Sequence, residues 1–230
     1  MTAPRTLPVA ARAAGSSAST RDRLLTAAAD LLAERGYEAV SIRAVTQAAG
    51  SSVSAAHYHF GSKEALVRET LRSRIEPMNA RRLALLSALE AEGAPTVREI
   101  VEAFLRPALE FSAGGDEAAL TYRRLPASVH YAPPERIQGL YREIFGEVAD
   151  RFLAALERAL PGRDPRDLPL AFQLGIGAMV QATGGHAESI VGIEGDGEAM
   201  LTCLARFVTE GILASCPAVG GGDDERGRPS

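Results

Sequence analysis

The stretch SIRAVTQAAGSSVSAAHYHFGSKEAL, residues 41–66, decides the fold of this chain. It predicts two short helices joined by a tight turn and followed by the start of a third helix. Ser41 can cap the first helix, Gly50 can take the left-handed backbone that ends it, and Ser52 can cap the second. The first helix has apolar residues at helical spacing, namely Ile42, Val45 and Ala49. The stretch therefore predicts a helix-turn-helix.

The second of these helices, expected from Val53 to about His59, has a surface unlike that of a solvated helix. Where Lys and Glu would be expected, it carries Ser54, Ala55, His57 and Tyr58. Small side chains let a backbone approach another surface closely, and Ser, His and Tyr can hydrogen-bond to phosphates or base edges. Lys63, in the first turn of the third helix, is unfavourable for the helix dipole and so indicates a nearby anion. These features predict docking onto DNA.

The region contains a set of residues in a distinctive order: Ala49-Gly50, Ser52, Tyr58-His59-Phe60, Ser62-Lys63-Glu64 and Leu66. Over roughly residues 20–72 this order resembles the DNA-binding domain of TetR-type transcriptional regulators. The chain departs from the family at Ser51, where an apolar residue is usual, and at His57, where Tyr or Asn is more common. The first departure can loosen the turn, and the second can alter which bases are read.

The residue chemistry and the resemblance agree on a set of DNA contacts. Tyr58 is expected to reach a phosphate through its hydroxyl, and Val53 or Ala55 to touch a thymine methyl group. Further phosphate contacts are expected from Ser41, Arg43, Ser52 and Lys63. Base edges are expected to be read by Val53, Ser54, Ala55 and His57. His59 completes the predicted DNA-binding set, whereas Ala56 and Phe60 are expected in the core.

The net charge of −4 is distributed unevenly along the chain. Residues 1–82 carry 12 basic and 7 acidic residues, net +5, whereas the remainder carries 13 and 22, net −9. This distribution supports DNA binding through the N-terminal part and argues against it elsewhere. Asymmetry of this size also arises by chance, so charge alone does not decide the question.

Other sequence properties predict a cytoplasmic protein without a cofactor or a metal. No apolar run approaches the roughly 20 residues needed to span a bilayer, and no continuous apolar segment follows the N-terminal arginines. Cys203 and Cys216 are the only cysteines, so a disulfide framework is not expected and Cys203 is expected to be buried and reduced. His57 and His59 would point in different directions from one helix, and no further ligand completes a metal shell.

Strand signals are absent, so the predicted class is all-α with about nine helices, one of them from Glu117 to His130. A long helix from Ser62 to about Glu90 would connect the two parts, with a kink or a break at Pro77. The expected segments are a disordered arm (1–18), the helix-turn-helix domain (19–66), a ligand-binding and dimerisation domain (67–216) and a disordered tail (217–230). The arm could enter a minor groove or be a tail without function.

The last two helices, expected over about 165–190 and 197–214, are rich in small residues and apolar over more than one face. An excess of apolar surface indicates a partner subunit. This agrees with the homodimer that the resemblance implies, which is held by a four-helix bundle from the last two helices of each subunit. The predicted interface consists of Phe172, Ile176, Met179, Thr183, Leu201, Leu204, Val208 and Ile212.

TetR-type regulators typically bind a small-molecule effector among their C-terminal helices, which gives the aromatic residues of this part a second interpretation beside core packing. The residues expected to line such a site are Phe104, Leu105, Phe111, Tyr122, Leu125, His130, Phe145, Phe152, Phe172 and Met179. This composition predicts a mostly apolar effector with one or two polar handles.

Together these patterns predict a ligand-responsive, DNA-binding transcriptional regulator, most simply a homodimeric repressor of a palindromic double-stranded operator. A competing hypothesis is a helical enzyme or small-molecule carrier in which the helix-turn-helix is incidental. An enzyme would need an acid/base pair, a nucleophile or a metal cluster. The isolated His130 and His186 and the scattered Glu residues form no such group by spacing. An activator or a DNA-coating protein would differ from a repressor only in the location and number of operators.

Overall fold

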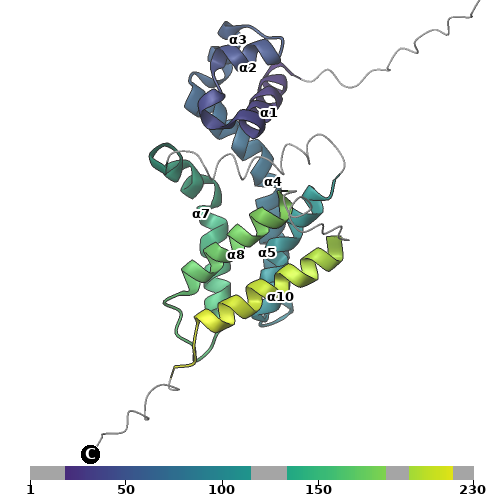
Figure 1. Ribbon diagram of the computed structural model, residues 1–230, viewed down its shortest axis with the longest axis vertical. Helices are drawn as coiled ribbons and strands as arrows, with labels where there is room; N and C mark the ends of the chain where they lie inside the picture. The colour runs from purple at the N-terminus through teal and green to yellow at the C-terminus, as the bar shows by residue number, and fades with distance from the viewer. Residues whose placement is uncertain (1–18, 115–133, 185–196, 220–230) are drawn as a thin grey trace, which may run out of the picture.

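The computed structural model describes residues 19–114, 134–184 and 197–219. Within these ranges the chain forms eight helices and one isolated bridge, between Arg163 and Ala218. The helices form a small N-terminal part and a larger C-terminal bundle (Figure 1). The all-α prediction is confirmed, while the helix expected from Glu117 to His130 lies outside the described residues.

The N-terminal part packs α1 (Thr20–Ala39), α2 (Ile42–Ala48) and α3 (Val53–Phe60) around one small core. Ser19 begins α1 with a capping box, in which its hydroxyl accepts from the Asp22 backbone and the Asp22 carboxylate accepts from the Ser19 backbone. Gly36 interrupts the helical backbone inside α1 with φ 74°, so the chain turns and buries Tyr37 and Val40 against the core.

Three successive helices begin with the same serine cap. Ser41, Ser52 and Ser62 each accept a hydrogen bond from the backbone N–H three residues later, at 3.1 Å in every case. Such a cap contributes about 1 kcal/mol to helix stability. Between α2 and α3 the backbone of Gly50 has φ 59°, and the Ser51 N–H donates to the Thr46 carbonyl at 2.9 Å. The predicted helix-turn-helix is therefore present, with its caps and its turn glycine.

A single long helix, α4 (Lys63–Glu92), belongs to both parts of the molecule. Its 30 residues correspond to a length of about 45 Å. Its first turns pack on α1 and α3, and its later turns enter the C-terminal bundle (Figure 1). Pro77 lies inside α4 and removes one helical hydrogen bond, yet the helix continues to Glu92, so the break considered from the sequence does not occur.

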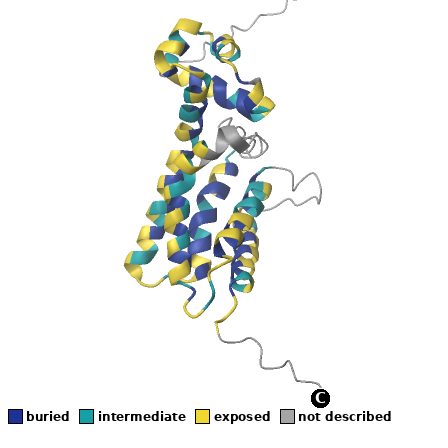
Figure 2. Cartoon of the chain, turned by 90° about the vertical axis from the view of Figure 1, so that its left-hand side faces the viewer, coloured by how far each residue is buried: buried dark blue, intermediate teal, exposed yellow. Residues whose placement is uncertain are grey.

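The C-terminal bundle adds α5 (Val97–Ser112), α7 (Pro134–Arg158), α8 (Leu168–Thr183) and α10 (Gly197–Ser215). Helix α4 packs on α5 and α7, and α10 packs on α5 and α8. The Phe104 ring meets the rings of Phe152 and Phe172 edge to face, with centroids 5.2 and 4.9 Å apart. Buried residues line the inward sides of these helices (Figure 2). Three aromatic rings therefore join α5, α7 and α8.

A buried arginine crosses this core. Arg82 of α4 is only 1% exposed, and its guanidinium lies 4.1 Å from the centroid of the Phe104 ring. Its Nε donates to the Phe104 carbonyl at 2.8 Å and its Nη1 to Asn79 Oδ1 at 3.2 Å. Asn79 Nδ2 in turn donates to the Ile144 carbonyl of α7 at 2.9 Å. Two polar side chains of α4 thus fix its position against α5 and α7.

The end of α10 is held by the loop between α7 and α8. Arg163 Nη1 donates to the carbonyls of Leu213 and Cys216 at 2.7 and 2.8 Å, which satisfies acceptors that a helix end leaves open. The Val219 N–H donates to the Gly162 carbonyl at 2.8 Å. The tail predicted to be disordered from residue 217 is therefore ordered over residues 217–219, because its backbone pairs with this loop.

The expected burial of Cys203 was wrong. Cys203 is exposed, because it lies on the side of α10 that faces away from α5 and α8, whereas Cys216 is fully buried. Burial raises the pKa of the Cys216 thiol. Cys216 is thus the unreactive thiol of the pair.

Among the residues that the structure describes, no helix is long and apolar enough to cross a bilayer.

We expect Arg163→Ala to lower the unfolding temperature by several degrees, because the α10 carbonyls lose charge-assisted hydrogen bonds worth about 2 kcal/mol. Arg166→Ala is the matched control, since Arg166 pairs with Asp164 of its own loop and its side chain is 86% exposed. Thermal unfolding followed by circular dichroism measures both variants. Equal shifts in the two variants would contradict the assigned role of Arg163.

Candidate nucleic-acid interface

Helix α3 has one face in the core and one face in solvent. Ala56 and Phe60 are buried, as predicted, and they anchor the helix against the rest of the N-terminal part. Tyr58 is 86% exposed and Val53 is 43% exposed. The other outward residues are Ser54, His57 and His59, with Ala55 half-buried. An apolar anchor therefore presents a row of small, hydroxyl and imidazole side chains to the outside.

The two capping serines of the predicted interface remain available to a phosphate. The hydroxyls of Ser41 and Ser52 accept from backbone N–H groups at the starts of α2 and α3, and both residues are exposed. A serine hydroxyl that accepts one hydrogen bond still has its own proton to donate. Arg43, in the first turn of α2, is also exposed. The geometry is thus compatible with the phosphate contacts expected from these three residues.

Lys63 has an aromatic partner in the chain. Its Nζ lies 4.3 Å from the centroid of the Tyr37 ring, which is a cation–π distance. An ammonium has three N–H donors, so contact with a ring face leaves donors for an anion. Tyr37, held inward after Gly36, therefore orients Lys63 at the start of α4. This contact was not expected from the sequence, because it joins residues from two different helices.

The ring of His57 is fixed by the end of its own helix. Nδ1 lies 2.9 Å from the Gly61 carbonyl oxygen. A carbonyl only accepts, so Nδ1 carries the proton and Nε2 of the neutral ring is an acceptor. Any base contact of His57 must therefore be made through Nε2. Such an acceptor suits the amino group of adenine or cytosine in the major groove.

Within the described ranges, no group of three or more His, Cys, Asp or Glu residues is arranged to hold a metal ion. His57 and His59 both lie on the exposed side of α3, where His59 contacts the ring of Tyr58 with centroids 5.3 Å apart. The chemistry of this face is therefore hydrogen bonding and apolar contact.

The residues predicted to line an effector site fall into three groups. Phe104, Leu105, Phe152, Phe172 and Met179 are buried in the bundle core, and Phe145 is half-buried beside them. Phe111, in the last turn of α5, is 40% exposed. Tyr122, Leu125 and His130 lie outside the described residues.

The sequence analysis missed two polar residues among these apolar ones. Arg82 Nη2 lies 3.3 Å from the sulfur of Met179, and Asn79 is 6% exposed. A charged residue on a long, mixed helix gives no sequence signal of burial, since most such residues face solvent. Arg82 and Asn79 are thus buried polar groups among the apolar residues of the bundle core.

Most of the residues predicted for a dimer interface are covered within the chain itself. Ile176 is half-buried, and the other seven residues are buried within the chain: Phe172, Met179, Thr183, Leu201, Leu204, Val208 and Ile212. They are covered because α8 and α10 pack through this side on each other and on α5. The apolar residues left outside on these two helices are Leu170, Leu174 and Phe207, which are 61%, 66% and 67% exposed.

Comparison with known proteins assigns both parts of the chain to one family. Residues 24–70 match the family described as "Bacterial regulatory proteins, tetR family", and residues 102–211 match "Tetracyclin repressor-like, C-terminal domain". The two matches agree with the division into an N-terminal part and a C-terminal bundle.

Individual relatives and a solved structure are also similar to this chain. The HTH-type transcriptional repressor KstR2 of Rhodococcus jostii is 30% identical over 157 residues, which cover 66% of this chain and 72% of that protein. KstR2 of Mycolicibacterium smegmatis is 44% identical over 55 residues, which cover 24% of this chain and only 27% of that protein. A transcriptional regulator of Saccharomonospora viridis in complex with choline has a TM-score of 0.54 and 20% identity, covering 82% of this chain and 94% of that one. At that identity the structural likeness shows the fold alone.

We expect Tyr58→Phe and Lys63→Met to weaken binding to every DNA sequence alike, by about fivefold each, because each loses a phosphate contact. His57→Ala should instead flatten the preference at one base position per half-site, since Nε2 is lost. Selection from random oligonucleotides followed by fluorescence anisotropy measures both effects. If all three variants behave identically, this division of roles is wrong.

Proposed function

The chain belongs to the tetR family of bacterial regulatory proteins, and we propose on that premise that it is a DNA-binding transcriptional repressor. Its homodimer would occupy a palindromic operator and leave it when a small, mostly apolar effector binds to the C-terminal bundle. A regulator of this kind needs no catalytic group, in keeping with the family of regulatory proteins to which both parts of the chain match. Its place of action would be the cytoplasm, where the DNA is.

The observation that carries the DNA-binding proposal is the exposed face of α3. The helix contains no acidic residue, and the exposed side chains of Ser54, His57 and Tyr58 can each form a hydrogen bond with DNA. In the sequence, the N-terminal residues 1–82 carry a net charge of +5. Positive charge supplies the sequence-independent part of the affinity, and hydrogen bonds to base edges supply the specificity.

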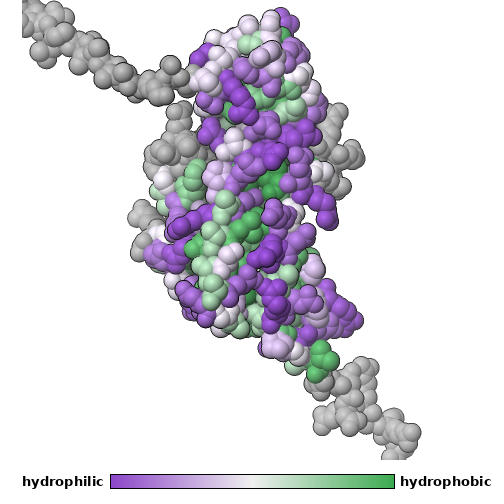
Figure 3. All heavy atoms as spheres, turned by 180° about the vertical axis from the view of Figure 1, so that it is seen from behind, coloured by the Kyte–Doolittle hydropathy of each residue, from purple (hydrophilic) through white to green (hydrophobic). Residues whose placement is uncertain are grey.

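The homodimer is supported by the outer face of α8 and α10, the two helices at the front in Figure 1. Leu170 and Leu174 lie one turn apart on α8, and Phe207 lies on α10. On the opposite side of the molecule, shown in Figure 3, hydrophilic side chains are spread over both parts with hydrophobic ones between them. An exposed apolar face of this kind is typical of a subunit interface.

The glycines of α8 and α10 distinguish contacts within the chain from contacts with a partner. A Cβ built on Gly175 would lie 2.8 Å from Val208 Cγ1, so Gly175 is explained by the packing of α10 on α8. A Cβ on Gly177 or Gly211 would meet nothing within 4 Å. A glycine inside a helix costs about 1 kcal/mol relative to alanine, so these two positions suit a close approach of helices from a second subunit.

The effector proposal rests on the buried core between α4, α5 and α8. Aromatic rings and Met179 provide an apolar lining, and Arg82 with Asn79 provides polar handles. Most small-molecule sites combine an apolar wall with a few placed polar groups. The choline bound to the Saccharomonospora viridis regulator is compatible with a small-molecule site in proteins of this fold.

We expect the purified protein to bind a DNA fragment from immediately upstream of its own gene, and not a scrambled fragment, in fluorescence anisotropy at moderate salt. The affinity should fall steeply as salt is raised, because DNA-bound counterions are released on binding. Equal binding to both fragments would place the operator elsewhere or indicate a co-purified effector. Absence of binding to either fragment would contradict the proposed function.

We expect Phe207→Glu to give a monomer in sedimentation analysis and to weaken operator binding at least tenfold, because a carboxylate would be buried in the apolar interface. Val219→Glu is the matched control: Val219 is 72% exposed, lies beyond the end of α10 and is not one of the proposed interface residues. A dimeric Phe207→Glu protein would show that subunits associate through another surface.

A further inference from the structure

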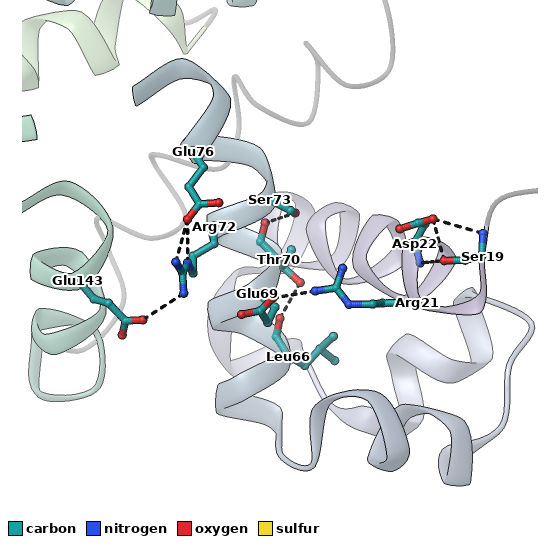
Figure 4. Close-up of polar contacts among 10 residues, drawn as sticks. All are labelled: Ser19, Arg21, Asp22, Leu66, Glu69, Thr70, Arg72, Ser73, Glu76 and Glu143. Atoms are coloured by element: carbon teal, nitrogen blue, oxygen red, sulfur yellow. Dashed lines mark hydrogen bonds and ion pairs between the residues drawn. The ribbon is translucent and has the colours of Figure 1, made fainter. Parts of the chain in front are cut away.

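Helix α7 holds α4 on both sides of Pro77. On the C-terminal side, the Ile144 carbonyl accepts from Asn79, and Arg151 pairs with Glu90 at 2.8 Å. On the N-terminal side, the Glu143 carboxylate lies 3.1 Å from Arg68 Nε. It also lies 3.9 Å from Arg72 Nη1 (Figure 4). Glu143 therefore attaches α7 to the half of α4 that belongs to the DNA-binding part.

That half of α4 is joined to the helix-turn-helix by both polar and apolar contacts. Glu69 accepts from Arg21 of α1 at 2.7 Å (Figure 4), and Arg74 Nη2 donates to Thr26 of α1 at 3.2 Å. The buried side chains of Leu66 and Leu71 add an apolar seam between the same elements. A change in the angle of this half of α4 is therefore a change in the position of α3.

Pro77 is the point at which such a change is easiest. Proline has no N–H, so the carbonyl of Ser73 loses its helical hydrogen bond and the helix is weaker there than elsewhere. Beyond Pro77 the helix is fixed by the buried Asn79 and Arg82, whereas before it the polar link to α7 is the partly exposed carboxylate of Glu143.

We propose that Glu143 is a positioning residue for DNA binding: by bridging Arg68 and Arg72 it clamps the N-terminal half of α4 to α7 and holds α3 in its operator-binding orientation. The inference rests on the proposed function, in which the ligand-free protein is the form that binds DNA. Glu143 touches no DNA in this scheme and acts only through the two arginines.

The charge of Glu143 makes the test informative. Glu143→Gln removes a negative charge, which by long-range electrostatics can only strengthen DNA binding. Loss of the clamp should weaken operator binding by about two- to fivefold per subunit, the range for an exposed ion pair, while binding to scrambled DNA does not fall. Glu147→Gln is the matched control, because Glu147 is exposed one turn further along α7 and carries the same charge.

A distance measurement tests the clamp without DNA. Spin labels at Gln47→Cys on α2 and Asp150→Cys on α7, both exposed positions, are introduced with Cys203→Ser, and labelled protein is mixed with an excess of unlabelled protein. The distance distribution should be narrow in the parent and in Glu147→Gln, and broader or shifted in Glu143→Gln. Arg68→Gln should reproduce the change, and the double variant should add little to it.

The two readouts separate the possible failures. An unchanged distance distribution in Glu143→Gln, or an equal change in Glu147→Gln, overturns the clamp whatever the protein does with DNA. A broadened distribution with unaltered operator affinity also overturns it, because the clamp would then not position α3. If the parent does not distinguish operator from scrambled DNA, the proposed function fails, and the distance measurement still decides whether Glu143 fixes the DNA-binding part.

Discussion

The burial of Arg82 is the constraint on which the arrangement of the helices depends. A guanidinium removed from water costs several kcal/mol unless its donors are satisfied, so the surrounding elements must supply acceptors in fixed places. The Phe104 carbonyl of α5 does so, and Asn79, which accepts from Arg82 within α4, donates on to the Ile144 carbonyl of α7. Rotating or sliding α4 would break the bonds to the Phe104 and Ile144 carbonyls together. The register of α4 against α5 and α7 is therefore set by hydrogen bonds as well as by apolar packing.

Helix α4 also forms part of the DNA-binding domain. The contacts that hold Arg82 in the bundle therefore also determine where α3 lies. Arg82 lies five residues beyond Pro77, in the half of α4 that the bundle encloses. The other half carries the helix-turn-helix through Leu66, Glu69 and Arg74. The C-terminal half of α4 is thus held in the bundle by buried hydrogen bonds, whereas the polar link of its N-terminal half to α7 is an exposed ion pair. One backbone hydrogen bond is missing between the two halves.

The sequence predicted the helix-turn-helix well because its signals are local. Gly50 and the three serine caps act within four residues of themselves, so spacing alone locates them. The faces of α8 and α10 could not be assigned in this way. Periodicity identifies apolar positions but not which neighbour covers them, and α10 is apolar on two sides. Leu204 meets its own chain while Phe207 does not, and only the packed structure tells them apart. Burial of Arg82 depends on three other helices and has no local signal.

The difference in strength between the two ends of α4 suits the proposed switching of the protein by a small molecule. Coupling between two sites in a protein is typically worth about 1–3 kcal/mol. The proposed effector would rearrange the side chains around Phe104 and Met179, which contact Arg82. Its binding would therefore change the contacts that hold α4 in the bundle. At the N-terminal end of α4, movement of the helix is opposed by exposed ion pairs, each worth about 0.2–1 kcal/mol. Coupling of that size is enough to overcome such pairs but not to unfold the core, so the DNA-binding part can turn while the bundle stays intact.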